Sequence, residues 1–347
     1  MDPDASIRST DNDAAVARLS AVQKRYLDDP FIKHLVPRAH LQPLRPPLIN
    51  IGTFVRSYAI DDLTTQWLEE SGKLNQPCQI VSLGSGSDTR FWRIATGPLK
   101  ENLATYVEID FPEITTKKAM AIRKSRELSS VLGTPADVTL SQGSTALHAP
   151  KYHLLPNDLR LPPAETMEHL FTTLSPSTET PILSSSLPTL LIFECVLAYI
   201  SPEISSRLLE WFVAQFSKSS APSGGVLGCV VYEMFGLADT FGRVMVNNLK
   251  TRNISIPGAE PFLTLDSLSQ RFVSSGFTAA HALTLREIRK TYVDRAELER
   301  ISTLELLDEM EELDLVLDHY AISWGLFLSN PPHGSSWPHW GLKKRQK

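Results

Sequence analysis

The chain has 347 residues, of which 42% are hydrophobic, 17 are glycine and 24 are proline, a composition that excludes fibrous, collagen-like and wholly disordered proteins. Its 34 basic and 39 acidic residues give a net charge of −5. The basic residues are dispersed along the chain, which argues against a generic binder of nucleic acid or of anionic membranes. The length fits one enlarged domain or two ordinary ones.

The amino-terminal sequence MDPDASIRSTDNDAA is polar and acidic, whereas a secretory signal has a basic start followed by an apolar run. No segment supplies the roughly 20 consecutive apolar residues that span a bilayer; the longest candidate, residues 190–200, contains Glu194. Cys78, Cys195 and Cys229 cannot all pair, so we expect reduced thiols in a cytoplasmic or nuclear protein. The histidines are scattered without metal-ligand spacing, so we expect no metal.

Strands and helices alternate along the chain. A helix-rich stretch at residues 14–71 comes before the first strand, and a second excess of helical sequence lies at residues 237–271. From apolar runs and spacing, strands are predicted at residues 79–83, 104–109, 151–155, 189–193, 226–232, 278–285 and 320–328, and helices from residue 88, at 203–216 and at 304–317. This alternation predicts a mostly parallel α/β sheet that is covered on both faces. The two helical excesses are placed to cap its carboxyl edge, where such folds bind ligands.

The loop after the first strand reads Gly84-Ser85-Gly86-Ser87-Asp88. Glycines at a strand-to-helix turn let the backbone approach a ligand closely, and the next helix offers free N–H groups. The alternative is that these glycines serve the turn alone. Thr89 stands where the dinucleotide pattern has its third glycine, which disfavours NAD and FAD.

Acidic residues stand where three further strands end. Asp110 follows the second strand and is placed to accept hydrogen bonds from a ribose diol, although it could instead cap the helix that begins near Pro112. Asp158 follows the third strand, and Glu194 ends the fourth within LIFECVLAYI. A carboxylate in such an apolar run is costly to bury without a partner; the alternative is that Glu194 points to water. The pattern alone predicts a nucleotide-binding α/β enzyme.

Four segments, QIVSLGSGSDTRFWRI, YVEIDFPEITTKKA, LPTLLIFECVLAYISPE and LELLDEMEELDLVLDHYAISWG, closely resemble the leucine carboxyl methyltransferase family. The resemblance extends from about Ala14, through DDPFIKHLV and INIGTFVRSYA, to WGLKK. It implies S-adenosylmethionine-dependent methylation of the C-terminal leucine carboxylate of type 2A protein phosphatase catalytic subunits. It also implies a class I methyltransferase fold, which is a seven-stranded, mostly parallel, doubly wound sheet with an antiparallel last strand and an enlarged helical lid.

The resemblance assigns roles to residues that match the family's motifs. Gly84 matches the cofactor-loop glycine and Asp110 the ribose-binding acid, while Asp158 and Leu159 match the pair lining the adenine. Glu194 matches the acid of the fourth strand at the cofactor.

The same alignment implies three further site residues. Arg56 matches an arginine that anchors the methionine carboxylate of the cofactor and neighbours the substrate. Arg18 stands where the family commonly has a lysine; the charge is kept, but the geometry of an arginine differs. Tyr199 is a candidate wall of the methyl-transfer pocket, with packing against the following helix as its alternative. Selectivity for a leucine side chain needs an apolar pocket, for which Phe54, Tyr232, Phe241 and Trp324 are candidate walls, with a place in the core as the alternative for each.

We expect residues 1–13 to form a disordered tail and residues 14–347 a single methyltransferase domain. Within it, we expect a helical cap (14–75), a cofactor-binding core (76–235), a lid or substrate insert (236–310), and a final helix, last strand and tail (311–347). Residues 172–188 and 217–225 are expected loops. We expect a monomer that binds the tail and folded surface of the phosphatase and neither nucleic acid nor membranes. The alternatives are a tRNA wybutosine-type carboxyl methyltransferase, a small-molecule O-methyltransferase and an inactive phosphatase-binding module.

Overall fold

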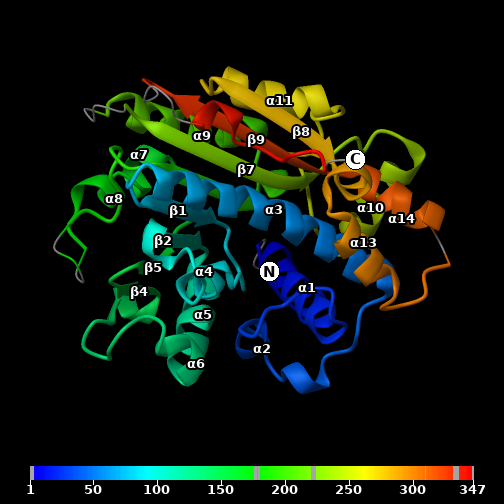
Figure 1. The fold of residues 1–347 in the computed structure, drawn as a ribbon, viewed down its shortest axis with the longest axis horizontal. Helices are drawn as coiled ribbons and strands as arrows, with labels where there is room; N and C mark the ends of the chain where they lie inside the picture. The colour runs from blue at the N-terminus through cyan, green and yellow to red at the C-terminus, as the bar shows by residue number, and fades with distance from the viewer. Residues whose placement is uncertain are drawn as a thin grey trace.

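The computed structural model describes residues 4–175, 178, 180–219, 224–308, 310–330 and 336–345. Its strands form one sheet with the order β3-β4-β5-β2-β1-β6-β7-β9-β8 (Figure 1). In chain order they are β1 (Cys78–Leu83), β2 (Leu103–Asp110), β3 (Thr139–Ser141), β4 (Ala146–Ala149), β5 (Tyr152–Pro156), β6 (Thr189–Glu194), β7 (Val226–Met234), β8 (Ala279–Thr284) and β9 (Tyr320–Leu328).

The helices that build the layers and the site fall into two groups along the chain. Before β6 these are α1 (Ala5–Gln23), α2 (Ile32–Leu35), α3 (Pro47–Lys73), α4 (Arg90–Ala95), α5 (Pro112–Lys124), α6 (Arg126–Ser129), α7 (Pro163–Thr166) and α8 (His169–Thr172). After β6 they are α9 (Pro202–Ser217), α10 (Thr240–Thr251), α11 (Leu265–Ser274), α12 (Leu285–Glu287), α13 (Arg295–Ser302) and α14 (Met310–Asp318). No helix in the described ranges is both long and apolar enough to cross a membrane.

The five central strands, β5, β2, β1, β6 and β7, are parallel, and β9 runs antiparallel between β7 and β8. The predicted mostly parallel, doubly wound sheet with an antiparallel last strand is therefore confirmed. The predicted number of seven strands is wrong, because β3 and β4 extend the sheet beyond β5 as an antiparallel pair. Each has only three or four residues, too few to establish a strand period in the sequence.

Helices cover both faces of the sheet, so each central strand is buried on both sides (Figure 1). The side chain of Ile80 packs into a core with α3, α4 and α5. Its neighbour Val81 points to the opposite face and packs with α9 and α11. Alternate residues of a strand point to opposite faces, which explains why the central strands read as continuous apolar runs rather than alternating ones.

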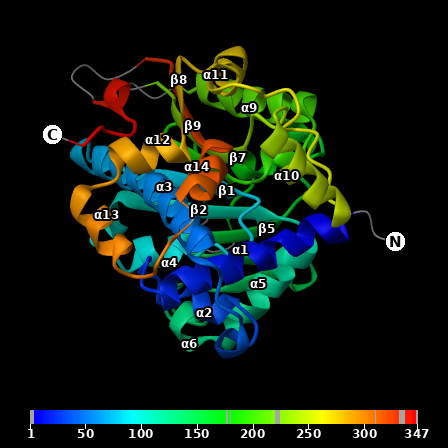
Figure 2. The same cartoon turned by 90° about the vertical axis from the view of Figure 1, so that its right-hand side faces the viewer.

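The amino-terminal segment differs from the expectation. Residues 5–13, which we expected to lie in a disordered tail, are the first half of α1. Figure 2 shows α1 lying beside α5 and close to α10. Its acidic residues pair with these neighbours: Asp11 lies 3.0 Å from Lys117 Nζ on α5, and Asp13 pairs with Arg252 at the end of α10. The polar composition therefore reflects ion pairing against the body of the molecule rather than solvation of a free tail.

The expected division into cap, core and lid also needs correction. Helix α3, placed in the cap, packs along one face of the sheet and buries Trp67 completely. The expected lid at residues 236–310 contains β8 and α11, which belong to the sheet and to its second layer. The helix expected at residues 304–317 starts only at Met310.

Candidate active site

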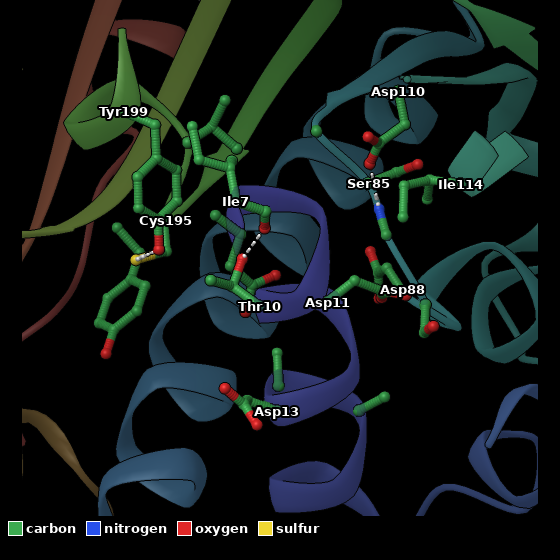
Figure 3. Close-up of a pocket in the computed structure, with 18 of the residues that line it drawn as sticks. Ile7, Thr10, Asp11, Asp13, Ser85, Asp88, Asp110, Ile114, Cys195 and Tyr199 are labelled. Atoms are coloured by element: carbon green, nitrogen blue, oxygen red, sulfur yellow. Dashed lines mark hydrogen bonds between the residues drawn. The ribbon is translucent and has the colours of Figure 1, made fainter. Parts of the chain in front are cut away.

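The carboxyl ends of β1, β2 and β6 meet α1 and α3 around a cavity of about 340 Å³ (Figure 3). At the end of β1, Gly84 has φ +68, and a Cβ atom there would collide with the side chain of Val196. Gly86 also has a positive φ, and its Cβ would lie 2.7 Å from Asp11 Oδ1. The positive φ disfavours a side chain at both positions, and residues of this loop form part of the cavity wall.

Asp110 lies at the tip of β2 and faces this loop. Its carboxylate accepts hydrogen bonds from the N–H groups of Gly86 and Phe111, each at 2.7 Å. It makes no capping bond to α5, whose cap residue is Phe111, so the structure does not support the helix-cap alternative. Burial raises the pKa of Asp110 to about 6, against the two N–H groups, which lower it.

Glu194 ends β6 and points into the molecule. Its Oε1 accepts a hydrogen bond from Nε of Arg56 on α3, and the glutamate side chain is 14% exposed. The alternative in which Glu194 points to water is therefore wrong. Burial lowers the pKa of Arg56, but Glu194, Tyr232 and Cys195 together raise it above its ordinary value.

Arg56 also packs against an aromatic ring. Its guanidinium lies 4.7 Å from the ring centroid of Tyr232, in the range of a cation–π contact. Tyr232 in turn stacks on Tyr320, with the ring centroids 5.5 Å apart and the planes 11° from parallel. Both tyrosines line the cavity, whereas Phe54, Phe241 and Trp324 do not appear in its wall. Of the four candidate walls for a leucine side chain, Tyr232 alone is at the cavity.

Asp158 and Leu159 lie in a smaller adjoining pocket, whose wall also includes Gly84 and Asp110. Leu159 is buried. The Asp158 carboxylate accepts hydrogen bonds from Arg160, with Nε to Oδ1 at 2.8 Å, so it lies at the pocket in a fixed position. The two pockets share Gly84 and Asp110 in their walls, so they lie directly beside each other.

Arg18 and Tyr199 both line the main cavity. The Arg18 guanidinium is bound to Asp29 Oδ2 at 2.6 Å and to Ser57 Oγ at 3.1 Å, so its charge is paired at the cavity wall. The Tyr199 hydroxyl lies 4.0 Å from the Cys195 thiol (Figure 3). The pKa of Tyr199 lies above its ordinary value, first because of Cys195 and then because of burial. Tyr199 therefore faces the cavity as a protonated phenol.

The sequence reasoning missed two contributions to this site. The first is the amino-terminal half of α1, whose Ile7, Thr10 and Asp11 line the cavity (Figure 3). The second is Arg90 on α4, which lies beneath Glu194 with Nη2 at 3.5 Å from Oε2. Arg90 lies within QIVSLGSGSDTRFWRI, one of the segments that resemble the family. The sequence therefore marks the residue but does not indicate which acid it contacts.

The family model described as leucine carboxyl methyltransferase matches residues 6–213 of this chain. Leucine carboxyl methyltransferase 1 of Cryptococcus neoformans is 44% identical to it over 346 residues, covering 93% of each chain. The chain belongs to the leucine carboxyl methyltransferase family.

Other relatives named leucine carboxyl methyltransferase 1 are more distant. The Aspergillus fumigatus protein is 38% identical and covers 93% of this chain and 83% of its own length. The Bos taurus protein is 35% identical and covers 92% of this chain and 90% of its own. A solved methyltransferase structure from Thermobifida fusca, at 14% identity and a TM-score of 0.49, covers 90% of this chain and 93% of that one, and is too distant to bear on the reaction. As a member of this family, the chain is an S-adenosylmethionine-dependent methyltransferase.

The donor set fits the cofactor of a leucine carboxyl methyltransferase. Among the described residues, Ser85 Oγ and Asn157 Nδ2 are buried without a hydrogen-bond partner. Ser85 lines the main cavity and Asn157 the adjoining pocket. Buried polar atoms normally have partners, so both are free to bond polar atoms of a ligand that spans the two pockets.

Proposed function

We propose that this enzyme transfers the methyl group of S-adenosylmethionine to the α-carboxylate of the C-terminal leucine of a type 2A protein phosphatase catalytic subunit, forming a methyl ester. The observation that carries the proposal is the Arg56–Glu194 pair at the cavity, beside the glycine loop. A guanidinium next to a carboxylate is complementary to the zwitterionic amino-acid end of the cofactor. Family membership supplies the leucine carboxylate as acceptor.

The other residues of the site are assigned to the remaining parts of the cofactor. Asp110 accepts hydrogen bonds from the ribose hydroxyls, and Asp158 and Leu159 hold the adenine in the adjoining pocket. Glu194 takes the ammonium group of the cofactor and Arg56 its carboxylate, with Arg18 as a second cation at the wall. The cofactor thus extends from the adjoining pocket, past Gly84, to the arginine end of the main cavity.

When bound, S-adenosylmethionine supplies a methyl group on a positively charged sulfur. A peptide α-carboxyl has a pKa of roughly 3.3 to 3.7, so the acceptor is already ionised at neutral pH and needs no general base. An anion and a cation come together, and both charges decrease as the methyl group transfers. The task of the protein is then to hold the two groups in line in a site from which water is excluded.

The role that suits Arg56 is orientation. A guanidinium that bound the acceptor carboxylate tightly would favour the charged ground state over the less charged transition state, and tight ground-state binding does not raise kcat. Its contacts with Glu194 and Tyr232 hold it on both sides, so it can direct a carboxylate without enclosing it. Tyr199 adds a neutral phenol donor at the same cavity.

The partner in this proposal is the folded catalytic subunit, held through both its tail and its surface. A short flexible tail loses conformational entropy on binding and buries little area, so recognition of the tail alone would be weak. We propose further that the enzyme acts as a monomer in the cytoplasm or nucleus and binds neither nucleic acid nor membranes.

The test is transfer of a labelled methyl group from S-adenosylmethionine to the folded phosphatase catalytic subunit, beside the same subunit without its terminal leucine. We expect label on the full subunit alone, and its release by mild base as for a carboxyl ester. Label on both subunits, or label that resists base, would contradict the assigned acceptor. No label on either, with S-adenosylhomocysteine still bound, would direct the search to tRNA and small carboxylic acids.

A further inference from the structure

A buried arginine beneath the site connects the acid of β6 to the rest of the molecule. Arg90, on α4, is 1% exposed. Its Nε lies 2.9 Å from Asp61 Oδ1, its Nη1 2.6 Å from Asp88 Oδ2, and its Nη2 3.5 Å from Glu194 Oε2. One guanidinium therefore joins α3, the glycine loop and the end of β6.

We propose that Arg90 is a positioning residue. It holds Glu194 against the cofactor's ammonium group while Arg56 binds the cofactor's carboxylate. This inference rests on the proposed function. Glu194 lies between two arginines, with Arg56 on Oε1 and Arg90 on the side of Oε2. Glu194 is bound through Nε of Arg56, so a carboxylate that Arg56 binds shares the guanidinium with Glu194, and Arg90 is the second cation that keeps Glu194 in place.

The geometry separates the tasks of the two arginines. Arg56 lines the cavity, whereas Arg90 is absent from its described wall, so Arg90 acts through Glu194 rather than on a ligand. Nη2 of Arg90 is buried and makes no hydrogen bond to a described residue. A buried guanidinium nitrogen without a partner is costly, and the nearby Glu194 Oε2 can satisfy it when the glutamate is released from Arg56.

The same helix provides a matched control. Arg93, one turn further along α4, also binds Asp61, with Nη1 at 2.6 Å from Oδ2 and Nη2 at 3.0 Å from Oδ1. Among the described residues it pairs with no other acid, and so lacks the contact with Glu194. Arg90→Lys and Arg93→Lys therefore disturb the same anchor on α3, while only the first also disturbs Glu194 and Asp88 of the glycine loop.

The experiment measures binding of two ligands by titration calorimetry to the full-length enzyme and to both variants. S-adenosylhomocysteine carries the amino-acid end that Glu194 would hold, and 5′-methylthioadenosine lacks it. For Arg90→Lys we expect at least a tenfold loss of affinity for S-adenosylhomocysteine and less than a twofold loss for methylthioadenosine. For Arg93→Lys we expect both affinities to stay within twofold of the unmodified enzyme.

A double variant tests whether Arg90 acts through Glu194. In a Glu194→Gln background, Arg90→Lys should cost no further affinity, because the group that it positions has lost its charge. Equal losses for both ligands would mean that Arg90 only supports the fold, and unchanged affinities would overturn the inference as well. Failure of the unmodified enzyme to bind S-adenosylhomocysteine would instead contradict the proposed function. If Arg90→Lys does not fold, Arg90→Gln is held to the same criteria.

Discussion

Asp110 shows how a single side chain combines a structural and a binding role. Its carboxylate accepts two backbone N–H groups, one of them from Gly86 in the loop that lines the cavity. The same carboxylate is the group that we assign to the ribose hydroxyls. Both roles require the ionised form, since a protonated carboxyl loses acceptor capacity.

The raised pKa of Asp110 leads to a prediction for ligand binding. Because burial raises this pKa to about 6, the fraction of ionised Asp110 falls as the pH falls through 6. We expect the affinity for S-adenosylhomocysteine to be constant above about pH 7 and to fall roughly tenfold per pH unit well below pH 6. Calorimetric titration between pH 5 and 8 measures it. Asp110→Asn should bind weakly at every pH without this slope; a flat profile for the unmodified enzyme would contradict the assignment.

At the scale of elements, α1 is the helix whose amino-terminal half the sequence did not place at the site. Its first half has no amphipathic period that would announce a buried face, yet Ile7, Thr10 and Asp11 all line the cavity. Asp4 binds Arg160 at 2.7 Å and Asp11 binds Lys117 at 3.0 Å. Such partly exposed pairs individually contribute little, but together they fix the helix over the site.

Removal of residues 1–13 tests whether the first half of α1 forms a wall of the site. We expect the shortened chain to bind S-adenosylhomocysteine at least tenfold more weakly, because the cavity loses one wall and gains water. Calorimetry measures the loss, and far-ultraviolet circular dichroism checks that the remaining fold is intact. Ser9→Ala, on the exposed side of the same helix, should leave the affinity unchanged. Unaltered binding by the shortened chain would mean that residues 5–13 form no working part of the site.

The β4–β5 pair carries a second feature at this scale. His148 and His153 are directly opposite each other in the register, and their Nδ1 atoms are 3.1 Å apart, so one ring donates and the other accepts. Burial, and then His148, lower the pKa of His153 to about 3. Both rings are therefore neutral in the folded protein at pH 7.

This histidine pair should make the fold sensitive to acid. The folded pKa of His153 lies below the unfolded value of about 6.5, so its neutral form stabilises the fold fully above pH 6.5, and the contribution is lost as the pH falls toward 3. Between pH 6.5 and 5 we expect a loss on the order of 2 kcal/mol in the free energy of unfolding, measured by urea denaturation. His153→Gln should reduce this slope, whereas His339→Gln, an exposed position, should keep it. An equal slope in His153→Gln would rule out this origin.

At the scale of the whole molecule, the features that could be predicted from the sequence are those that depend on neighbouring residues in the chain. The seven predicted strands all occur; the central ones are apolar runs buried on both faces, whereas β8 is a more exposed edge strand. Gly84, Asp110 and Glu194 were found because they follow such runs directly. The edge strands β3 and β4, the helical state of residues 5–13 and the pairing of Arg90 were not found, since they depend on neighbours distant in the chain. The strands near the centre could thus be read from local pattern, and the walls of the site could not.

Helix α3 joins the two ends of this architecture, with Arg56 at the site and Trp67 near its other end. Trp67 is completely buried and packs against Trp337 and Trp340 near the carboxyl terminus, with ring centroids 4.3 and 4.9 Å apart. Trp340 Nε1 also donates a hydrogen bond to the Leu63 carbonyl at 3.0 Å. At about 1.5 Å per residue, this cluster lies roughly 16 Å from Arg56 along the helix.

Stability and ligand binding should therefore be separable along α3. Trp337 is 0% exposed, so Trp337→Ala leaves a large cavity and should destabilise the fold by about 3 to 5 kcal/mol, with a correspondingly lower Tm by calorimetry. The affinity for S-adenosylhomocysteine, measured well below that Tm, should stay within about twofold, because the site is at the other end of the helix and α3 keeps its remaining contacts with the sheet. Trp337→Phe, which retains an aromatic ring against Trp67, should lose less stability. A tenfold loss of affinity in Trp337→Ala would instead mean that packing at the carboxyl terminus sets the position of Arg56, and that α3 transmits strain along its length.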